Sequence, residues 1–139
     1  MDDPFDLQRF VAAQAATYDR ARAELQAGRK RSHWMWFVFP QIAGLGHSAM
    51  AVAFAISSLA EAQAYLAHPV LGPRLRDCTQ LVNRVEGCSI GDIFGSPDDI
   101  KFRSSMTLFS RATADNAVFL QALQKYFGGE TDRLTEARL

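Results

Sequence analysis

The sequence predicts an all-α fold: a compact, irregular domain built from about six to nine helical segments. Apolar residues recur at spacings of three and four, helix start and stop residues separate the segments, and no two segments alternate like paired strands. At 139 residues, with 48% apolar and 22% charged residues, the chain is expected to form one domain spanning residues 1–139 with its own core.

The first predicted helix spans residues 6–27. Asp6 is placed to cap its start, and Gly28 follows its end, where a left-handed residue commonly stops a helix. The apolar stripe of this helix comprises Leu7, Phe10, Val11, Tyr18, Ala21 and Leu25.

Residues 33–41 form the most unusual segment, His-Trp-Met-Trp-Phe-Val-Phe-Pro-Gln. Ser32 is placed to cap a short helix there, which Pro40 would end. A strand is the competing interpretation, because aromatic and β-branched residues favour strands. No other segment resembles a partner strand, so a helix is predicted.

The rest of the chain contains further helices separated by serine caps, glycines and prolines. Ser48 and Ser58 are placed as caps, and Glu61 stands three residues after Ser58, as in a capping box. The expected helical segments are residues 48–56, 59–68, 71–85, 89–94, 96–112, 116–127 and 132–138.

Charge and composition argue against several classes of protein. Fifteen basic and fifteen acidic side chains cancel, which argues against nucleic acid as a partner. The longest uncharged run, residues 32–60, is interrupted by glycine, proline and polar residues, so no membrane span is expected. The acidic N-terminus lacks the features of a signal peptide, which predicts a cytoplasmic protein.

No metal site or cofactor is expected. The three histidines lack ligand spacing, and Cys78 and Cys88 have no histidine nearby. Both cysteines are predicted to be inert, partly buried residues. The glycine loop at residues 44–48 matches neither a Walker loop nor a dinucleotide fingerprint.

Several polar residues occupy positions where the helical pattern expects apolar ones. Gln14 falls within the stripe of the first helix, Lys101 and Ser105 fall within the apolar arc of the helix from Pro97, and Ser104 lies at its edge. Arg103, Thr107 and Ser110 occupy the opposite face, which is expected to face water. Either Gln14 bonds neighbouring backbone and Lys101 reaches water or an acid, or these residues line a cavity.

The aromatic segment allows the same two interpretations. Trp34 and Trp36 either pack in the core or stack against a planar ligand. Arg31 and His33 precede them and Gln41 follows, so charged and polar groups flank the rings.

Several blocks of the sequence together carry a family resemblance that covers most of the chain. They are Arg9-Phe10-Val11 with Ala13-Gln14, residues 28–41, Gly44-Leu45-Gly46, residues 68–72 with Arg74-Leu75, Ile93-Phe94-Gly95 and residues 98–109. In these blocks the chain resembles the bacterial "domain of unknown function 1810" family. The resemblance implies a mainly helical, one-domain fold and no known activity. Some members carry the label calpastatin, but no feature of this sequence supports protease inhibition.

These observations lead to the hypothesis of one pocket that binds, or binds and processes, a small anionic or nucleotide-like ligand. If the protein is an enzyme, His33 is the expected general acid or base, because histidine titrates near neutrality. The alternative hypothesis is a non-catalytic interaction module, such as a homodimer, with the aromatic segment as core or interface. The proposed ligand-binding residues are Gln14, Tyr18, Arg31, Trp34, Trp36, Gln41, Lys101, Ser104 and Ser105.

Overall fold

The computed structural model describes residues 3–139, which contain ten helices and no strand. The all-α prediction is confirmed, and the count exceeds the expected range by one because the first predicted helix is two helices. The helices are α1 (Gln8–Ala15), α2 (Tyr18–Gln26), α3 (Met35–Val38), α4 (Ala49–Ala53), α5 (Leu59–Ala67), α6 (Leu71–Arg84), α7 (Ile90–Phe94), α8 (Asp98–Ala112), α9 (Ala117–Phe127) and α10 (Arg133–Glu136).

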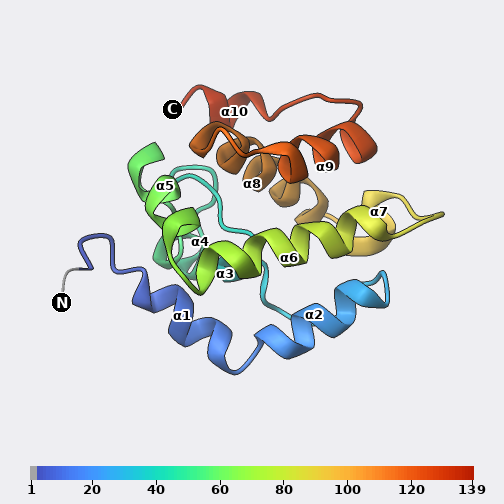
Figure 1. Cartoon of the computed structure of the whole chain (residues 1–139), viewed down its shortest axis with the longest axis horizontal. Coiled ribbons are helices and arrows are strands. Elements are labelled where there is room, and N and C mark those ends of the chain that lie inside the picture. The colour runs from blue at the N-terminus through green and yellow to red at the C-terminus, as the bar shows by residue number, and fades with distance from the viewer. Residues whose placement is uncertain (1–2) are drawn as a thin grey trace.

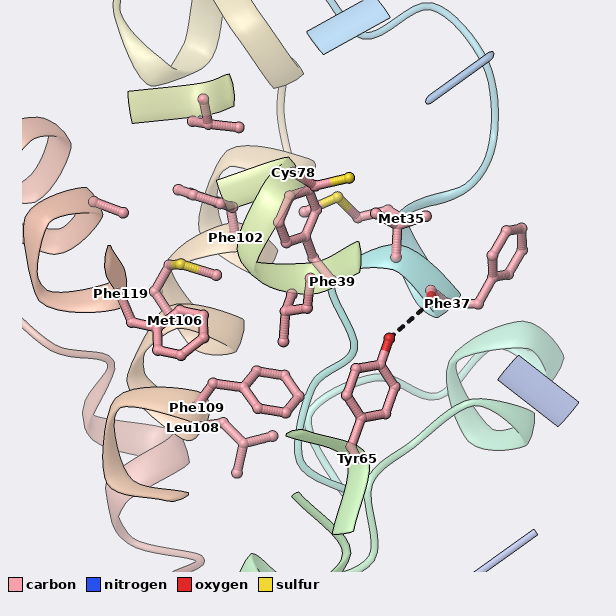
Figure 2. Close-up of a cluster of buried hydrophobic side chains, with 14 of the residues drawn as sticks. Met35, Phe37, Phe39, Tyr65, Cys78, Phe102, Met106, Leu108, Phe109 and Phe119 are labelled. Atoms are coloured by element: carbon pink, nitrogen blue, oxygen red, sulfur yellow. Dashed lines mark hydrogen bonds between the residues drawn. The ribbon is translucent and has the colours of Figure 1, made fainter. Parts of the chain in front are cut away.

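Two long helices organise the packing. The helix α8 contacts α5, α7, α9 and α10, while α6 contacts α2, α5 and α9. In Figure 1, α1 and α2 run along one side of the molecule, α8 to α10 lie on the other, and α6 lies between them. The buried apolar side chains form one connected core, in which rings from the aromatic segment meet rings from α8 (Figure 2).

The first predicted helix is broken at Ala16 and Thr17, where α1 and α2 meet at an angle (Figure 1). The Thr17 hydroxyl donates to the Ala13 carbonyl oxygen at 2.9 Å, a bond that competes with the regular helix ladder. Consequently Gln14 and Tyr18, predicted on one stripe of one helix, lie on two helices, and Arg74 of α6 contacts both of them.

The predicted helix starts were correct where the capping partner is local. Ser48 accepts a hydrogen bond from Ala51 N and Ser58 from Glu61 N. The Glu61 side chain, however, accepts from Ser57 instead of completing the capping box on Ser58.

Two predicted caps were wrong. At the start of α1, the Asp3 carboxylate accepts from the backbone of Leu7 and Gln8, whereas Asp6 has a φ of 52°. Ser32 donates to Glu24 instead of capping α3. Asp3 thus binds the backbone at the start of α1, whereas the residue that precedes α3, Trp34, caps it with no side-chain hydrogen bond.

Glu24 of α2 holds the start of the aromatic segment in place. Its carboxylate accepts hydrogen bonds from Arg31 N at 2.7 Å, Ser32 N at 3.0 Å, Ser32 Oγ at 2.6 Å and Trp34 Nε1 at 2.9 Å. Burial alone would raise the pKa of Glu24, but these hydrogen bonds outweigh it and lower the pKa to about 2.

The loop after the aromatic segment is fixed by the isolated parallel bridge between Ile42 and Ile56. Ala43 N donates to Ile56 O and Ile56 N donates to Gln41 O, each at 2.8 Å. Gly44 has a φ of 98°, and the Arg138 guanidinium packs where a side chain at this position would stand. The C-terminal segment therefore contacts this loop.

The face of α8 that was expected to face water is largely covered. Thr107 is buried under the segment before α10, where Asp132 N donates to its Oγ1 at 2.9 Å, and Ser110 is buried as well. Arg103 remains partly exposed and bonds Thr131 O. The prediction missed this cover because the contacts join residues 25 to 28 positions apart in the chain.

None of the helices within residues 3–139 has the length and apolar character needed to cross a membrane. Cys78 is buried and Cys88 is exposed, so the prediction of partial burial was wrong for Cys88. Burial raises the pKa of the Cys78 thiol to about 12, which makes it a poor nucleophile.

Candidate functional site

Gln41, Lys101 and Ser104 line one cavity of about 210 Å³. It lies between the loop that follows the aromatic segment, the first half of α8 and the start of α10. We call it the Lys101 cleft. Its polar side chains come from Gln41, Lys101, Ser104 and Asp132, and its apolar walls come from Leu45, Pro97, Ile100 and Leu134, with Gly46 completing the lining.

A larger hollow of about 580 Å³ adjoins this cleft along residues 129–136. Its lining is almost entirely charged or polar, with Leu134 the one large apolar side chain. Small-molecule sites usually combine apolar walls with a few polar groups. The Lys101 cleft has that combination and is therefore the better candidate.

Lys101 lies on the first turn of α8 and has a loosely held ammonium group. Its Nζ lies 3.7 Å from Asp98 Oδ1, which is too long for a hydrogen bond, and 5.7 Å from the centre of the Trp36 ring. Asp98 is instead held by Lys30, whose Nζ lies 2.9 Å from Asp98 Oδ2. Within residues 3–139, no group accepts a hydrogen bond from Lys101 Nζ.

Asp132 faces the same cleft from the start of α10. Its Oδ2 accepts from Ser104 Oγ at 3.1 Å, from Thr135 N at 3.0 Å and from Thr135 Oγ1. The backbone N of Asp132 donates to Thr107 Oγ1 at 2.9 Å, which fixes the residue on α8. No donor in the described part of the chain reaches Asp132 Oδ1.

The two tryptophans differ in environment. Trp34 is fully buried, donates to Glu24 and packs with Phe39 and Phe94. Trp36 is half-buried, and its Nε1 is buried without a hydrogen-bond partner in residues 3–139. Trp34 is thus a core residue, whereas Trp36 lies beside Lys101.

Gln14 does not reach the cleft. Its Nε2 donates to Phe37 O at 2.7 Å and to Tyr65 Oη at 3.2 Å, and Arg74 donates to its Oε1 at 3.3 Å. Tyr65 also donates to Phe37 O, as the dashed line in Figure 2 shows. Gln14 therefore satisfies a buried backbone carbonyl, which is the structural alternative raised by the sequence.

Tyr18 lies in another polar group, between α2 and α6. Its hydroxyl donates to Asp77 at 3.2 Å, and the Arg74 guanidinium lies 4.4 Å from the centre of its ring. Burial and the nearby Asp77 raise the pKa of Tyr18 far above its usual value. These contacts join α2 to α6 and lie outside the cleft.

The remaining predicted residues are also outside the cleft. Arg31 and His33 are exposed in the turn before α3. Ser105 is buried in the protein interior, and its Oγ has no partner within the described residues. The structure thus brings together Gln41, Lys101 and Ser104, places Trp36 next to Lys101, and separates the other predicted residues from them.

Sequence reasoning missed the contribution of Asp132 and Leu134. Both were part of a predicted terminal helix, but no local pattern indicates that this helix packs on α8. The pairing depends on Ser104 and Thr107, whose hydroxyls bind Asp132 from 28 and 25 positions away. Among residues 3–139, no group of three or more histidine, cysteine or acidic side chains is arranged to hold a metal ion.

The chain resembles a solved structure over almost its whole length. The crystal structure of the conserved hypothetical protein Rv1873 from Mycobacterium tuberculosis has 64% sequence identity to this chain and a TM-score of 0.98. The match covers 99% of this chain and 98% of that one. A search of curated proteins gave no significant match.

The family comparison agrees with the blocks quoted from the sequence. The match extends over residues 4–139, which includes the aromatic segment, all of α8 and the C-terminal segment. The chain therefore belongs to the family described as "Protein of unknown function (DUF1810)".

Proposed function

We propose that the protein binds a small molecule with an acidic group in the Lys101 cleft. The observation that carries this proposal is the Lys101 ammonium, which lines a cavity while no group in residues 3–139 accepts a hydrogen bond from it. A fully buried lysine almost always has a partner. The Lys101 side chain is 26% exposed, and its one ion-pair partner within residues 3–139, Asp98, lies 3.7 Å away and is held more closely by Lys30. A carboxylate or similar group in the cleft would supply the missing acceptors.

The walls of the cleft also support a bound ligand. Ile100 is 58% exposed and Leu134 is 67% exposed, although both side chains are large and apolar. A ligand between them would remove part of this surface from water, which favours binding by about 25 cal/mol per Å². The proposed ligand therefore has an apolar part in addition to its acidic group.

The size of the cavity favours a small acid over a whole nucleotide. Its volume of about 210 Å³ lies below the range of roughly 300–1,000 Å³ typical of small-molecule pockets. The proposal is limited to binding, because no histidine or cysteine lines the cleft. His33 has no part in it.

A ligand screen with matched variants tests the proposal. Thermal-shift measurements would compare small carboxylates, phosphates and sugar phosphates against the wild type, Lys101→Met and Arg20→Gln. Arg20 is a suitable control because it is exposed and has no ion pair within residues 3–139.

At least one small acid is expected to stabilise the wild type and Arg20→Gln. For that acid, Lys101→Met is expected to weaken binding by about 10- to 100-fold, because a hydrogen bond to a charged group contributes about 1.5–3 kcal/mol. A ligand that binds Lys101→Met as tightly as the wild type would contradict the proposal.

A second candidate function is self-association through the exposed rim of the cleft. Ile100 and Leu134 are neighbouring exposed apolar residues on α8 and α10, as expected for an interface. Light scattering after size-exclusion chromatography distinguishes the two candidates. A dimer that becomes a monomer in Leu134→Lys would favour self-association, whereas a monomeric wild type would exclude it at the concentration measured.

A further inference from the structure

Asp98 is shared unequally between two lysines beside the Lys101 cleft, and Asp132 is the acidic side chain that lines the cleft itself. Lys30 and Asp98 pair closely, with Nζ and Oδ2 2.9 Å apart and the Lys30 side chain only 8% exposed. Lys101 and Asp132 then remain, each with unused hydrogen-bonding capacity. The cleft therefore offers one cation and one anion, with no excess of positive charge.

From this arrangement we infer that the ligand is a small zwitterion: a neutral amino acid with an apolar side chain. The inference rests on the proposed function and specifies the class of ligand. The ligand carboxylate accepts from Lys101, and its ammonium group donates to Asp132. The apolar side chain lies against Leu45, Ile100 and Leu134, which line the same cavity.

Asp132 is built to act as an acceptor at a fixed position. Three hydrogen bonds hold its Oδ2, and a fourth, from its backbone N to Thr107 Oγ1, anchors it on α8. Its Oδ1 receives no donor from residues 3–139. An ammonium group would fill this position with a charge-assisted hydrogen bond.

Asp132 also disfavours ligands that carry only negative charge. A phosphate beside Lys101 would bring about two negative charges close to the Asp132 carboxylate, and Lys101 neutralises one of them. Arg103 lies nearby on α8, but Glu130 and the Thr131 carbonyl oxygen already bind its guanidinium. A single carboxylate with an ammonium group matches the available charges better.

Gln41 adds a neutral polar group to the opposite wall. Its backbone oxygen is held by Ile56 N, which fixes the residue in the loop. No hydrogen bond to its side-chain amide is formed by residues 3–139. The amide can therefore donate to a ligand carboxylate or accept from its ammonium group.

Calorimetric titration with matched compounds tests the inference. The compounds are alanine, leucine and phenylalanine, together with isocaproate, which is leucine without the amine, isoamylamine, which is leucine without the carboxylate, and inorganic phosphate. At least one of the three amino acids is expected to bind. If leucine is that amino acid, it is expected to bind at least about tenfold more tightly than either of its single-charge analogues.

Two variants then test which side chain binds each charged group of the ligand. Lys101→Met and Asp132→Asn are each expected to weaken binding of the amino acid by about tenfold or more. Asn is chosen because it still caps a helix start, and a melting curve for each variant confirms folding. Isocaproate is expected to bind Asp132→Asn at least as well as the wild type. The control variants are Arg20→Gln and Asp19→Asn, both exposed on α2.

The outcomes separate this inference from the proposed function. If isocaproate or phosphate binds as tightly as the amino acids, the inference that the ligand is a zwitterion is wrong. The proposal that the cleft binds a small acid would then still hold. An amino acid that binds Asp132→Asn as tightly as the wild type would also overturn it. If none of the three amino acids binds, the inference is wrong, and the wider acid screen decides the proposed function.

Discussion

Glu24 shows how one side chain positions the aromatic segment. Its carboxylate joins α2 to the residues that precede α3 through four hydrogen bonds. One of these comes from Trp34, the largest fully buried side chain in the core. The core position of Trp34 therefore depends on a carboxylate ten residues earlier in the chain.

Replacing Glu24 with glutamine is expected to destabilise the protein by about 1–3 kcal/mol. Glutamine has one acceptor oxygen, and its NH₂ group would face donors, so at least one of the four donors loses its partner. Chemical denaturation followed by tryptophan fluorescence measures the change. Asp19→Asn, an exposed change in the same helix, serves as the control; a Glu24→Gln variant as stable as this control would contradict the account.

The contribution of Glu24 depends on pH. The pKa falls from the ordinary 4.5 to about 2 in the folded protein, so the carboxylate is favoured by folding. Its stabilising contribution is complete above about pH 4.5 and is lost as the pH falls towards 2. The difference in unfolding free energy between the wild type and Glu24→Gln is therefore expected to shrink over that range. A difference that stays constant would contradict this assignment.

Gln14 provides a second test at a single residue. Gln14→Leu is expected to cost about 1–3 kcal/mol, because the buried Phe37 carbonyl oxygen would keep only the long 3.4 Å bond from Tyr65. Ligand binding in the Lys101 cleft is expected to remain unchanged, since Gln14 lies elsewhere. Denaturation measures the loss of stability, and the ligand titration measures whether binding is unchanged. Loss of ligand binding in a folded Gln14→Leu protein would contradict the separation of the two regions.

Polar residues at apolar positions could be found from the sequence, but their partners could not. Helical geometry placed Gln14 and Ser105 among apolar residues, and both are buried. The partners of Gln14 lie 23, 51 and 60 residues away, and no local spacing reveals such contacts. The pattern therefore predicted the burial of these residues correctly, but it could not show that they would lie apart from one another instead of in one pocket.

At the scale of elements, helices with local end signals were predicted well. Ser48, Ser58 and Gly28 act within a few residues of their own position, so their effects can be read directly. The break at Thr17 was missed, because one hydroxyl bond to Ala13 changes the direction of a helix whose apolar pattern continues across it.

The C-terminal segment, residues 128–139, is held mainly by polar contacts to α8. None of its residues belongs to the hydrophobic core, and it binds α8 through Arg103, Ser104 and Arg111. The Arg111 guanidinium lowers the pKa of Glu136 by hydrogen bonding to its carboxylate. The exposed Arg103–Glu130 and Arg111–Glu136 ion pairs are screened by salt far more than apolar packing is.

This segment is expected to open locally before the rest of the fold. In about 1 M salt, where the Debye length is about 3 Å, backbone amides of residues 130–139 are expected to exchange faster than at low salt. The amides of α9, which is anchored by buried Phe119 and Leu123, are expected to change little. Hydrogen exchange measured by mass spectrometry at low and high salt compares the amides of residues 130–139 with those of α9. Equal acceleration in α9 and the terminal segment would contradict the difference.

For the whole molecule, composition and pattern were sufficient for the fold class and insufficient for the site. Helical periodicity and the lack of paired strands predicted the all-α architecture, which depends on local geometry. The Lys101 cleft joins residues from 41 to 134 in the chain, so it exists only once α8, the loop and α10 have packed together. Three of its residues, Gln41, Lys101 and Ser104, were predicted because they are polar residues within or beside apolar segments.

The central claim is that the Lys101 cleft is the binding site, and ligand-induced changes in backbone amide NMR shifts test it most directly. With the best ligand from the screen, we expect the largest changes within residues 41–46, 97–104 and 132–134, and little change in α1 and α2. The same titration of Lys101→Met is expected to give changes about tenfold weaker at equal ligand concentration below saturation. Saturable changes centred on another surface, or equal changes in Lys101→Met, would contradict the claim.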